Sequence, residues 1–313
     1  MSKTAFLFPG QGSQTPGMAA ALASQSAAAK SVLDEVDEAL GQKLSGLMAD
    51  GPADELTLTA NAQPALFASS LAVVAAIEEV TGKPLSDFGG FVAGHSLGEY
   101  SALAAVKVFD IATGAKLLRI RGNSMQEAVP VGEGAMAALI GADIDLATEI
   151  VAKAIAAGAV QIANDNAPGQ VVISGSLAGV RAAMAVAQDS GLKRVVELPV
   201  SAPFHSSLMA PAAEAMKSAL SETIFNAPIL PVYCNVTAAV ETAPDMLRDN
   251  LVTQVTGRVR WRETLQALQA AGVTRFVELG TGKVLSGLVK RTVKDVEIVS
   301  VETMDAIEAE FNS

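Results

Sequence analysis

The segment GHSLG, residues 94–98, places a serine between two glycines. It follows a short apolar run at 91–93 and precedes residues 99–106, which we expect to form a helix. A G-x-S-x-G segment between a strand and a helix is typical of a nucleophile elbow, whose sharp turn leaves no room for bulky neighbours. The turn would also place the Ser96 hydroxyl at a helix N-terminus, where backbone N–H groups stabilise negative charge. The alternative is that Ser96 only caps the helix.

A serine nucleophile needs a general base, usually a histidine. The sequence contains two histidines, His95 and His205. His95 adjoins Ser96, and neighbouring side chains on a tight turn diverge, so we expect His95 to be structural. His205 therefore remains as the candidate base, the alternative being a second structural histidine. Spacing singles out no acidic residue as a third member, and a backbone or amide oxygen could orient the imidazole instead.

Glycines also gather in the segment AFLFPGQGSQTPG, residues 5–17. A dinucleotide-binding fingerprint needs glycines at its first, third and sixth positions, but the sixth position here is Thr15. A P-loop needs Gly-Lys-Ser/Thr after the glycines, and that triplet does not follow. The spacing argues against both phosphate-binding loops. It leaves open whether this segment is an arm of a catalytic site or a strand that runs into a turn.

Composition limits the classes of partner. The chain of 313 residues is 50% hydrophobic and carries 22 basic and 33 acidic side chains, a net charge of −11. Such a chain, with few aromatic residues, is a poor candidate for nucleic-acid binding, because phosphate contacts need basic patches. The charge does not exclude an acidic protein partner that docks on a local basic patch. The single cysteine, Cys234, excludes an internal disulfide framework, and we expect it to be buried.

The N-terminal segment does not have the pattern of a secretion signal. Only residues 5–8 are apolar between Lys3 and Pro9, which is too short for the apolar region of a signal peptide. No stretch of about 18 apolar residues lacks a charge or a breaker, so we expect no membrane span. We expect a cytoplasmic protein, and the sequence has no metal-ligand spacing.

Short apolar runs alternate with Ala-rich helical stretches, which is the pattern of an α/β protein. The predicted strands of the larger part are 5–8, 91–93, 231–235, 275–279 and 297–301, with helices such as 65–80 and 110–126 between them.

The middle of the chain shows a different pattern. The predicted order is strand 135–140, helix 146–157, strands 160–163 and 170–174 joined by NDNAPG, helix 177–188 and strand 194–198. This βαββαβ order is typical of a ferredoxin-like unit. We therefore expect a small domain, 131–199, inserted into a large α/β catalytic domain, 1–130 and 200–313. A cleft between the two would be a favoured ligand site.

Seven segments, in order along nearly the whole chain, carry a resemblance to one family. They are FLFPGQGSQ, AQPAL, GHSLGEYSAL, RIRGNSMQEA, NAPGQVVISG, SAPFHSSLM and VELGTGKVLSGLVKR. Together they resemble the stand-alone malonyl-CoA:acyl carrier protein transacylases of fatty-acid synthesis. The resemblance implies a hydrolase-like α/β domain with a mostly parallel sheet and a ferredoxin-like insertion.

The resemblance also implies roles for several residues. The backbone N–H groups of Gln11, in GQGSQ, and of Leu97, after the nucleophile, would form the oxyanion hole. Arg121, in RIRGNSM, would bind the free malonyl carboxylate through paired hydrogen bonds. A plain acyl group would leave that arginine unpaired. Arg119, two positions earlier, is expected to be a solvated surface residue.

Four further positions match the family less specifically. Gln63 and Asn166 match positions near the substrate. Gln254 matches a glutamine whose backbone carbonyl orients the catalytic histidine, so that no triad aspartate is needed. Phe204 matches a position where, in related acyltransferases, phenylalanine accompanies malonyl and serine accompanies methylmalonyl groups.

The implied reaction is ping-pong transfer of malonyl from malonyl-CoA to Ser96, and then to the phosphopantetheine thiol of holo acyl carrier protein. Neither a metal nor a redox cofactor is implied, and we expect a monomer. Acyl carrier protein is acidic, so docking needs a local basic patch. The candidates for that patch are Lys193, Arg194, Lys283, Lys290, Arg291 and Lys294.

Two other functions stay open at this point. A serine hydrolase such as a thioesterase could use the same Ser96–His205 pair, although it would not need Arg121. A catalytically silent subunit that binds acyl carrier protein would be expected to lack Ser96 or His205, and both are present.

Overall fold

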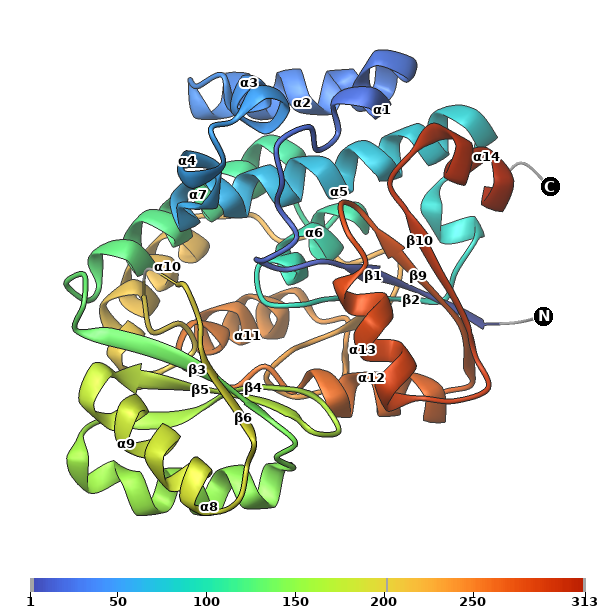
Figure 1. The fold of residues 1–313 in the computed structure, drawn as a ribbon. Helices are drawn as coiled ribbons and strands as arrows, with labels where there is room; N and C mark the ends of the chain where they lie inside the picture. The colour runs from blue at the N-terminus through green and yellow to red at the C-terminus, as the bar shows by residue number, and fades with distance from the viewer. Residues whose placement is uncertain (1–2, 201, 312–313) are drawn as a thin grey trace.

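The computed structural model describes residues 3–200 and 202–311 (Figure 1). Residues 1–2, 201 and 312–313, which the predicted domain ranges include, lie outside the described residues. Two sheets organise the chain, one of six strands and one of four. The α/β class expected from the alternation of apolar runs and helical stretches is confirmed.

The larger sheet has the strand order β10-β9-β1-β2-β7-β8. Its strands are β1 (Lys3–Phe8), β2 (Phe91–Gly94), β7 (Val232–Tyr233), β8 (Val240–Glu241), β9 (Val273–Leu279) and β10 (Glu297–Val301). All neighbouring strands are parallel except β7 and β8, which are antiparallel. The five predicted strands are confirmed, although only the first half of 231–235 pairs in the sheet.

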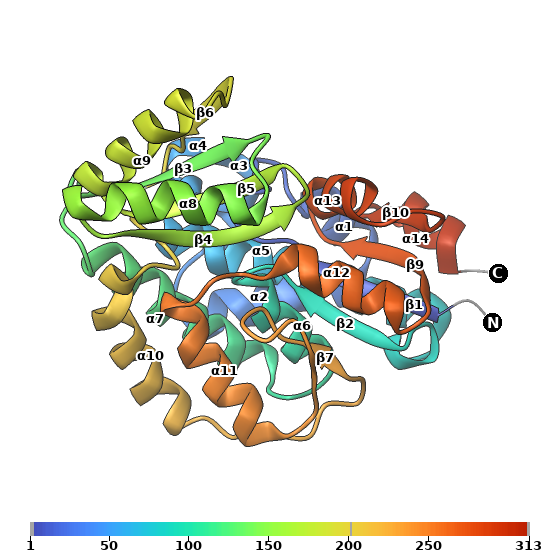
Figure 2. The same ribbon diagram turned by 90° about the horizontal axis from the view of Figure 1, so that it is seen from below.

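Helices cover both faces of this sheet, which explains why β2 and the segment 5–8 of β1, at its centre, are apolar on both faces. Along β1, Phe6 and Phe8 belong to one core cluster and Ala5 and Leu7 to another. Successive side chains of a strand point to opposite faces, so a strand segment that helices cover on both sides favours apolar residues at successive positions. Figure 2 shows α12 (Trp261–Ala270) and α13 (Val284–Thr292) on one side of the sheet and α5 (Thr59–Thr81) and α6 (Gly98–Ala105) on the other.

The remaining helices of this part pack mainly on other helices. They are α1 (Ala20–Gln25), α2 (Ala27–Leu40), α3 (Leu44–Asp50), α4 (Ala53–Thr57), α7 (Ile111–Glu127), α10 (Ala210–Ser221), α11 (Pro244–Thr256) and α14 (Met304–Phe311), with short 3-10 turns at Leu85–Asp87 and Ser207–Met209. Within the described ranges, one helix, α5, is long and apolar enough to cross a membrane, but 89% of its most apolar window is buried inside the fold. The protein's own core therefore uses that apolar surface.

The smaller sheet contains β3 (Gly134–Ile140), β4 (Val160–Ala167), β5 (Gln170–Ser176) and β6 (Arg194–Glu197), in the antiparallel order β4-β5-β3-β6. Two helices, α8 (Ile144–Ala154) and α9 (Leu177–Asp189), cover one face (Figure 1). The predicted βαββαβ order and the ferredoxin-like arrangement are confirmed. The predicted helix 146–157 is α8 followed by a 3-10 turn at Ile155–Ala157.

One predicted loop is wrong. The residues NDNA were expected to connect two strands, but β4 continues through them to Ala167, and only Pro168 and Gly169 form the turn. The pairing of β4 with β5 shifts register twice along these polar residues, once between Ile162 and Asn164 and once between Asp165 and Ala167. The outer edge of β4 also pairs with the segment before α12, since Asp165 N donates to Val259 O at 2.9 Å. This pairing joins the smaller sheet to the rest of the chain.

Candidate active site

Ser96 lies in the turn between β2 and α6, as the G-x-S-x-G pattern predicts. Its φ is +53°, a left-handed conformation that costs energy in a non-glycine residue. The flanking glycines allow close approach. A Cβ on Gly94 would lie 1.9 Å from Gly98 O, and a Cβ on Gly98 would lie 2.2 Å from Phe8 O. Any larger residue would push α6 away from β1 and β2.

Two amide side chains hold the strained Ser96 peptide. Ser96 N donates to Asn235 Oδ1 at 2.7 Å, and Gln254 Nε2 donates to Ser96 O at 3.0 Å. Asn235 also donates from Nδ2 to Gly94 O at 2.6 Å. The backbone on both sides of the nucleophile is therefore fixed by side chains from distant segments. Our sequence reasoning missed Asn235, because nothing in its local sequence marks it.

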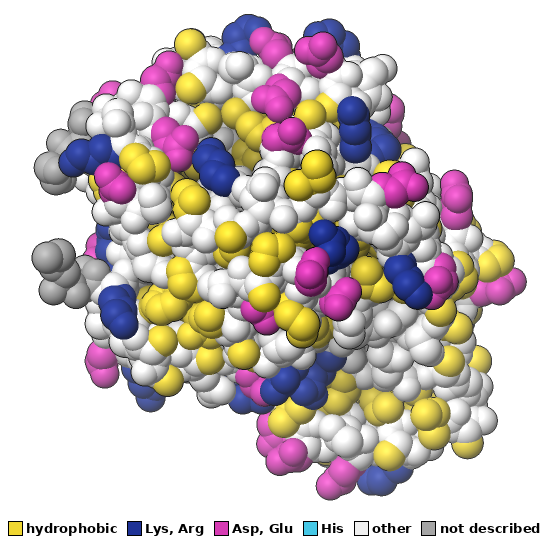
Figure 3. Space-filling view, turned by 180° about the vertical axis from the view of Figure 1, so that it is seen from behind, with side chains coloured by type: hydrophobic (Ala, Val, Ile, Leu, Met, Phe, Trp, Pro, Cys, Tyr) yellow, Lys and Arg dark blue, Asp and Glu magenta, His cyan; other side chains and the backbone are white. Residues whose placement is uncertain are grey.

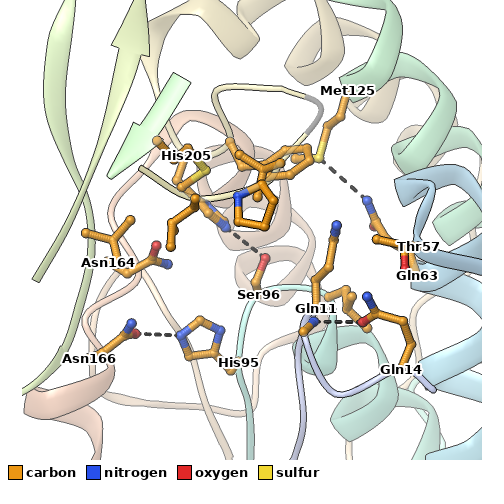
Figure 4. Close-up of a pocket in the computed structure, with 18 of the residues that line it drawn as sticks. Gln11, Gln14, Thr57, Gln63, His95, Ser96, Met125, Asn164, Asn166 and His205 are labelled. Carbon is orange, nitrogen blue, oxygen red and sulfur yellow. Dashed lines mark hydrogen bonds between the residues drawn. The ribbon is translucent and has the colours of Figure 1, made fainter. Parts of the chain in front are cut away.

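The structure brings His205 to Ser96, which lies 109 residues away in the chain. Ser96 Oγ lies 2.8 Å from His205 Nε2 (Figure 4). The other ring nitrogen, Nδ1, lies 2.9 Å from Gln254 O and 3.2 Å from Gly257 O, at the C-terminal end of α11. Since carbonyls only accept, Nδ1 carries the proton, and Nε2 is free to accept the Ser96 proton. The expected contact of the Gln254 carbonyl with the histidine is therefore present.

Carbonyls at the end of α11 contact His205 Nδ1, where an acid would lie in a catalytic triad. The last carbonyls of a helix lack helical partners and carry partial negative charge. The loop that carries His205, whose own φ is +55°, is further held by Gln161 from β4. Gln161 Nε2 donates to His205 O at 3.2 Å, and Ser207 N donates to Gln161 Oε1 at 2.9 Å.

Burial, followed by the positive charge of Arg121, lowers the pKa of His205 to about 3. The imidazole is therefore neutral at neutral pH, as a general base must be.

Arg121 is almost completely buried, with only 2% of its surface exposed. Its Nη1 donates to Gln63 Oε1 at 2.7 Å, and its Nη2 donates to Gln254 Oε1 at 2.9 Å and Ser96 Oγ at 3.2 Å. Burial lowers its pKa, but an arginine stays charged at neutral pH. Within the described part of the chain, no carboxylate forms an ion pair with Arg121. The guanidinium can thus receive an anionic group beside the nucleophile.

Arg119 is not the solvated residue that we expected. It is only partly exposed, and it donates to Asn61 Oδ1 at 2.8 Å and to Gln42 Oε1 at 2.6 Å. It turns away from the pocket because positions two apart lie on different faces of a helix.

The glycine-rich segment after β1 forms one wall of the pocket. Gln11 and Leu97 both line the pocket, and within the described residues neither backbone N–H has a hydrogen-bond acceptor. Gly10 lies against the elbow, since a Cβ there would be 2.7 Å from His95 O. Two free N–H groups beside Ser96 are the kind of donors that an oxyanion needs.

The pocket has a volume of about 350 Å³ and lies between the two sheets. Met136 of β3 and Val172 of β5 line it from the smaller sheet, and Phe204 lines it beside His205. Figure 4 shows His95 and Asn166 together on one side, where His95 Nε2 donates to Asn166 Oδ1 at 2.8 Å. Burial lowers the pKa of His95. His95 is thus engaged away from the Ser96 proton, as expected.

Two other expectations concern Cys234 and metal ligands. Cys234 is fully buried, and burial raises the pKa of its thiol, so it is not a nucleophile at neutral pH. Among residues 3–200 and 202–311, no group of three or more His, Cys, Asp or Glu side chains is placed to hold a metal ion.

Comparison with known proteins identifies the family. The sequence model of the family described as acyl transferase domain matches residues 5–306. The chain belongs to the acyl transferase family. It is 47% identical to the malonyl CoA-acyl carrier protein transacylase of Bacillus subtilis (strain 168), over 98% of this chain and 96% of that one. Within its family, it is thus a relative of the malonyl CoA-acyl carrier protein transacylases.

Solved structures of acyl transferases have the same fold as this chain. The acyl-carrier-protein-S-malonyltransferase of Bartonella henselae superimposes with a TM-score of 0.97 at 53% identity, covering 99% of this chain and 98% of that chain. A malonyl-transacylase in complex with a type II PKS acyl-carrier protein superimposes with a TM-score of 0.95 at 38% identity, with both chains fully covered.

Proposed function

We propose that this chain transfers a malonyl group from malonyl-CoA to the phosphopantetheine thiol of acyl carrier protein, and so supplies fatty-acid chain elongation. The observation that carries the proposal is the buried Arg121 guanidinium, whose Nη2 lies 3.2 Å from the Ser96 hydroxyl. A buried charge needs a partner, and the free carboxylate of a malonyl thioester bound at Ser96 would supply it.

In the first half-reaction, His205 Nε2 takes the Ser96 proton as Ser96 Oγ attacks the thioester carbonyl. The N–H groups of Gln11 and Leu97 stabilise the oxyanion, and the thiolate of coenzyme A leaves with the proton from His205. In the second half-reaction, His205 deprotonates the phosphopantetheine thiol, and the thiolate attacks the malonyl ester. The bond to Ser96 Oγ breaks, and Oγ takes the proton back from His205. Gln254 O orients the imidazole throughout, while Gln63 and Asn166 both line the pocket. No cofactor takes part in the proposed steps.

Acyl carrier protein is the proposed macromolecular partner, and the chain is proposed to act as a cytoplasmic monomer. The loop before α13 lies against the glycine-rich segment after β1, since a Cβ on Gly282 would be 3.3 Å from Ser13. Lys283 and Lys290 are exposed at this side of the molecule. A basic surface beside the pocket mouth would orient an acidic carrier so that its thiol enters.

The intact mass of the protein after brief incubation with malonyl-CoA, and again after addition of holo acyl carrier protein, tests this function. We expect a malonyl adduct on Ser96 that persists in water and moves to the carrier. An adduct lost to water at the same rate with or without carrier would instead identify a serine hydrolase. An adduct formed from a neutral acyl-CoA but not from malonyl-CoA would overturn the role of Arg121.

A further inference from the structure

Glu99 is a fully buried carboxylate in the first turn of α6, three residues after the nucleophile. Its Oε2 accepts a hydrogen bond from Gln254 Nε2 at 2.8 Å and another from Asn235 N at 3.0 Å. Among the described residues, its Oε1 has no hydrogen-bond partner. The reaction steps above do not use this group, although a buried carboxylate is costly unless something stabilises it.

The amide of Gln254 connects Glu99 to Arg121. Its Oε1 accepts from Arg121 Nη2 at 2.9 Å, while its Nε2 donates to Glu99 Oε2 at 2.8 Å. A guanidinium can only donate and an ionised carboxylate can only accept, so the two ends of the amide can bind in one orientation only. The two buried charges thus polarise one amide between them. Glu99 therefore lies one amide away from Arg121, without direct contact.

We propose that Glu99 is the internal counter-charge of Arg121, held through the Gln254 amide, and that it takes up a proton when a malonyl group occupies the site. This inference rests on the proposed function. A malonyl carboxylate bound to Arg121 would place two buried negative charges beside one positive charge. Protonation of Glu99 removes the excess charge, and the proton comes from solvent.

The geometry accommodates the protonated form. The proton would sit on Oε1, which has no hydrogen-bond partner among the described residues, so both hydrogen bonds to Oε2 persist. Burial raises the pKa of Glu99 to about 7, and hydrogen bonds from Gln254 and Asn235 and the charge of Arg121 oppose the rise. The proton therefore binds and leaves near neutral pH.

Other titratable groups near Glu99 do not titrate in this range. Burial raises the pKa of Tyr100, on the same helix, and of Cys234, which follows β7. Both stay neutral near pH 7, and Arg121 on α7 stays charged. A ligand that raises the pKa of one group binds more weakly as pH rises above the free-state pKa. The affinity for malonyl-CoA should therefore be constant below about pH 7 and fall above it, by up to about tenfold per pH unit.

The test counts protons during formation of the malonyl-enzyme. Wild-type protein and Glu99→Gln are mixed with malonyl-CoA at pH 8 in weak buffer with an indicator dye, and the adduct is counted by intact mass. The glutamine oxygen can accept both hydrogen bonds that Oε2 accepts, so the variant removes the charge and keeps the shape. Release of the coenzyme A thiol contributes equally to both proteins. We expect the wild type to take up as much as one proton more per adduct than the variant.

A second readout locates the proton. Infrared difference spectra with ¹³C-labelled malonyl-CoA should show a new carboxylic-acid band in the wild type that the label does not shift and that Glu99→Gln lacks.

Glu278→Gln changes another buried glutamate, which accepts from Leu285 N and Ser286 N at the start of α13. This control should show the same proton uptake and the same carboxylic-acid band as the wild type. An adduct formed with no proton uptake, or with equal uptake in Glu99→Gln, would overturn the inference and leave the proposed function standing. Absence of any adduct would overturn both.

Discussion

At the scale of the residue, Arg121 is a charged side chain that is almost completely buried at the pocket. Its hydrogen bonds go to the neutral oxygens of Gln63, Gln254 and Ser96. Neutral acceptors satisfy donors but do not neutralise a guanidinium, so an anionic substrate gains more here than a neutral one.

Replacement of Arg121 by alanine should therefore reverse substrate preference. We expect kcat/KM for malonyl-CoA to fall by roughly 30-fold to several thousandfold, equivalent to about 2 to 5 kcal/mol for a buried charged pair. The value for acetyl-CoA should change far less. Arg119→Ala is the matched control, because Arg119 bonds to Asn61 and Gln42 outside the pocket. Steady-state kinetics with both thioesters measure the ratio, and an equal loss for both would contradict specific carboxylate binding.

The pH dependence of acylation follows from His205. Burial and Arg121 lower its pKa to about 3, so the imidazole is the neutral base at any pH well above that value. As pH falls, the rate constant of malonyl-Ser96 formation should stay level from pH 7 to pH 5 and decline only below it. Quenched-flow mixing with mass detection measures this rate constant. An inflection near the ordinary histidine value of about 6.5 would show that the site does not suppress protonation.

At the scale of the element, the nucleophile depends on how closely α6 approaches β1. Gly98→Ala would place a Cβ 2.2 Å from Phe8 O and 2.8 Å from Pro9 O, so the helix must move. We expect a loss of about 1–3 kcal/mol in the free energy of unfolding, together with slower acylation, because the same movement displaces Ser96. Chemical denaturation and the acylation rate measure the two effects.

Gly287→Ala in α13 is the control for that substitution. A Cβ there meets nothing within 4 Å, so the alanine should stabilise the helix by about 0.5–1 kcal/mol through its higher helix propensity. If Gly98→Ala proved equally harmless, close packing at the elbow would not be what its glycines provide.

At the scale of the whole molecule, an acidic chain must attract an acidic carrier. Figure 3 shows the rear face, where basic and acidic side chains are interspersed. The proposed docking surface is on the side of α13, which lies at the front of Figure 1. Lys283, Lys290 and Lys294 are exposed there, and Arg291 bonds to Gln170 of the smaller sheet.

Charge reversal tests this surface. Lys283→Glu and Lys290→Glu should each slow malonyl transfer to the carrier, by about tenfold at low salt and less at high salt, because the steering force is screened. Lys217→Glu makes an equal charge change at an exposed position of α10, and it should not slow the transfer. Rates of carrier malonylation, measured for each variant at two ionic strengths, test whether this surface docks the carrier. Equal effects of all three changes would mean that net charge, not a local surface, controls docking.

The amino-acid sequence alone predicted the elements and the Ser96–His205 pair that the structure brings together. These predictions rest on three patterns: apolar runs of strand length, helical periodicity and G-x-S-x-G. Each pattern involves residues close together in the chain and reports the local backbone geometry, so it could be recognised without the tertiary structure. The chain has only two histidines, and His95 lies inside the elbow. Elimination therefore selected His205 as the candidate base.

Only the tertiary structure decided how that pair is held and charged. Asn235 and Gln254 contact Ser96 or Glu99 across 136 to 158 residues of chain. Gln161 reaches the His205 loop from the smaller sheet. Such contacts depend on the docking of two sheets and on the orientation of single amides, which no local pattern encodes. The loop NDNAPG was misjudged for the same reason, because its polar residues join a strand edge that another segment completes.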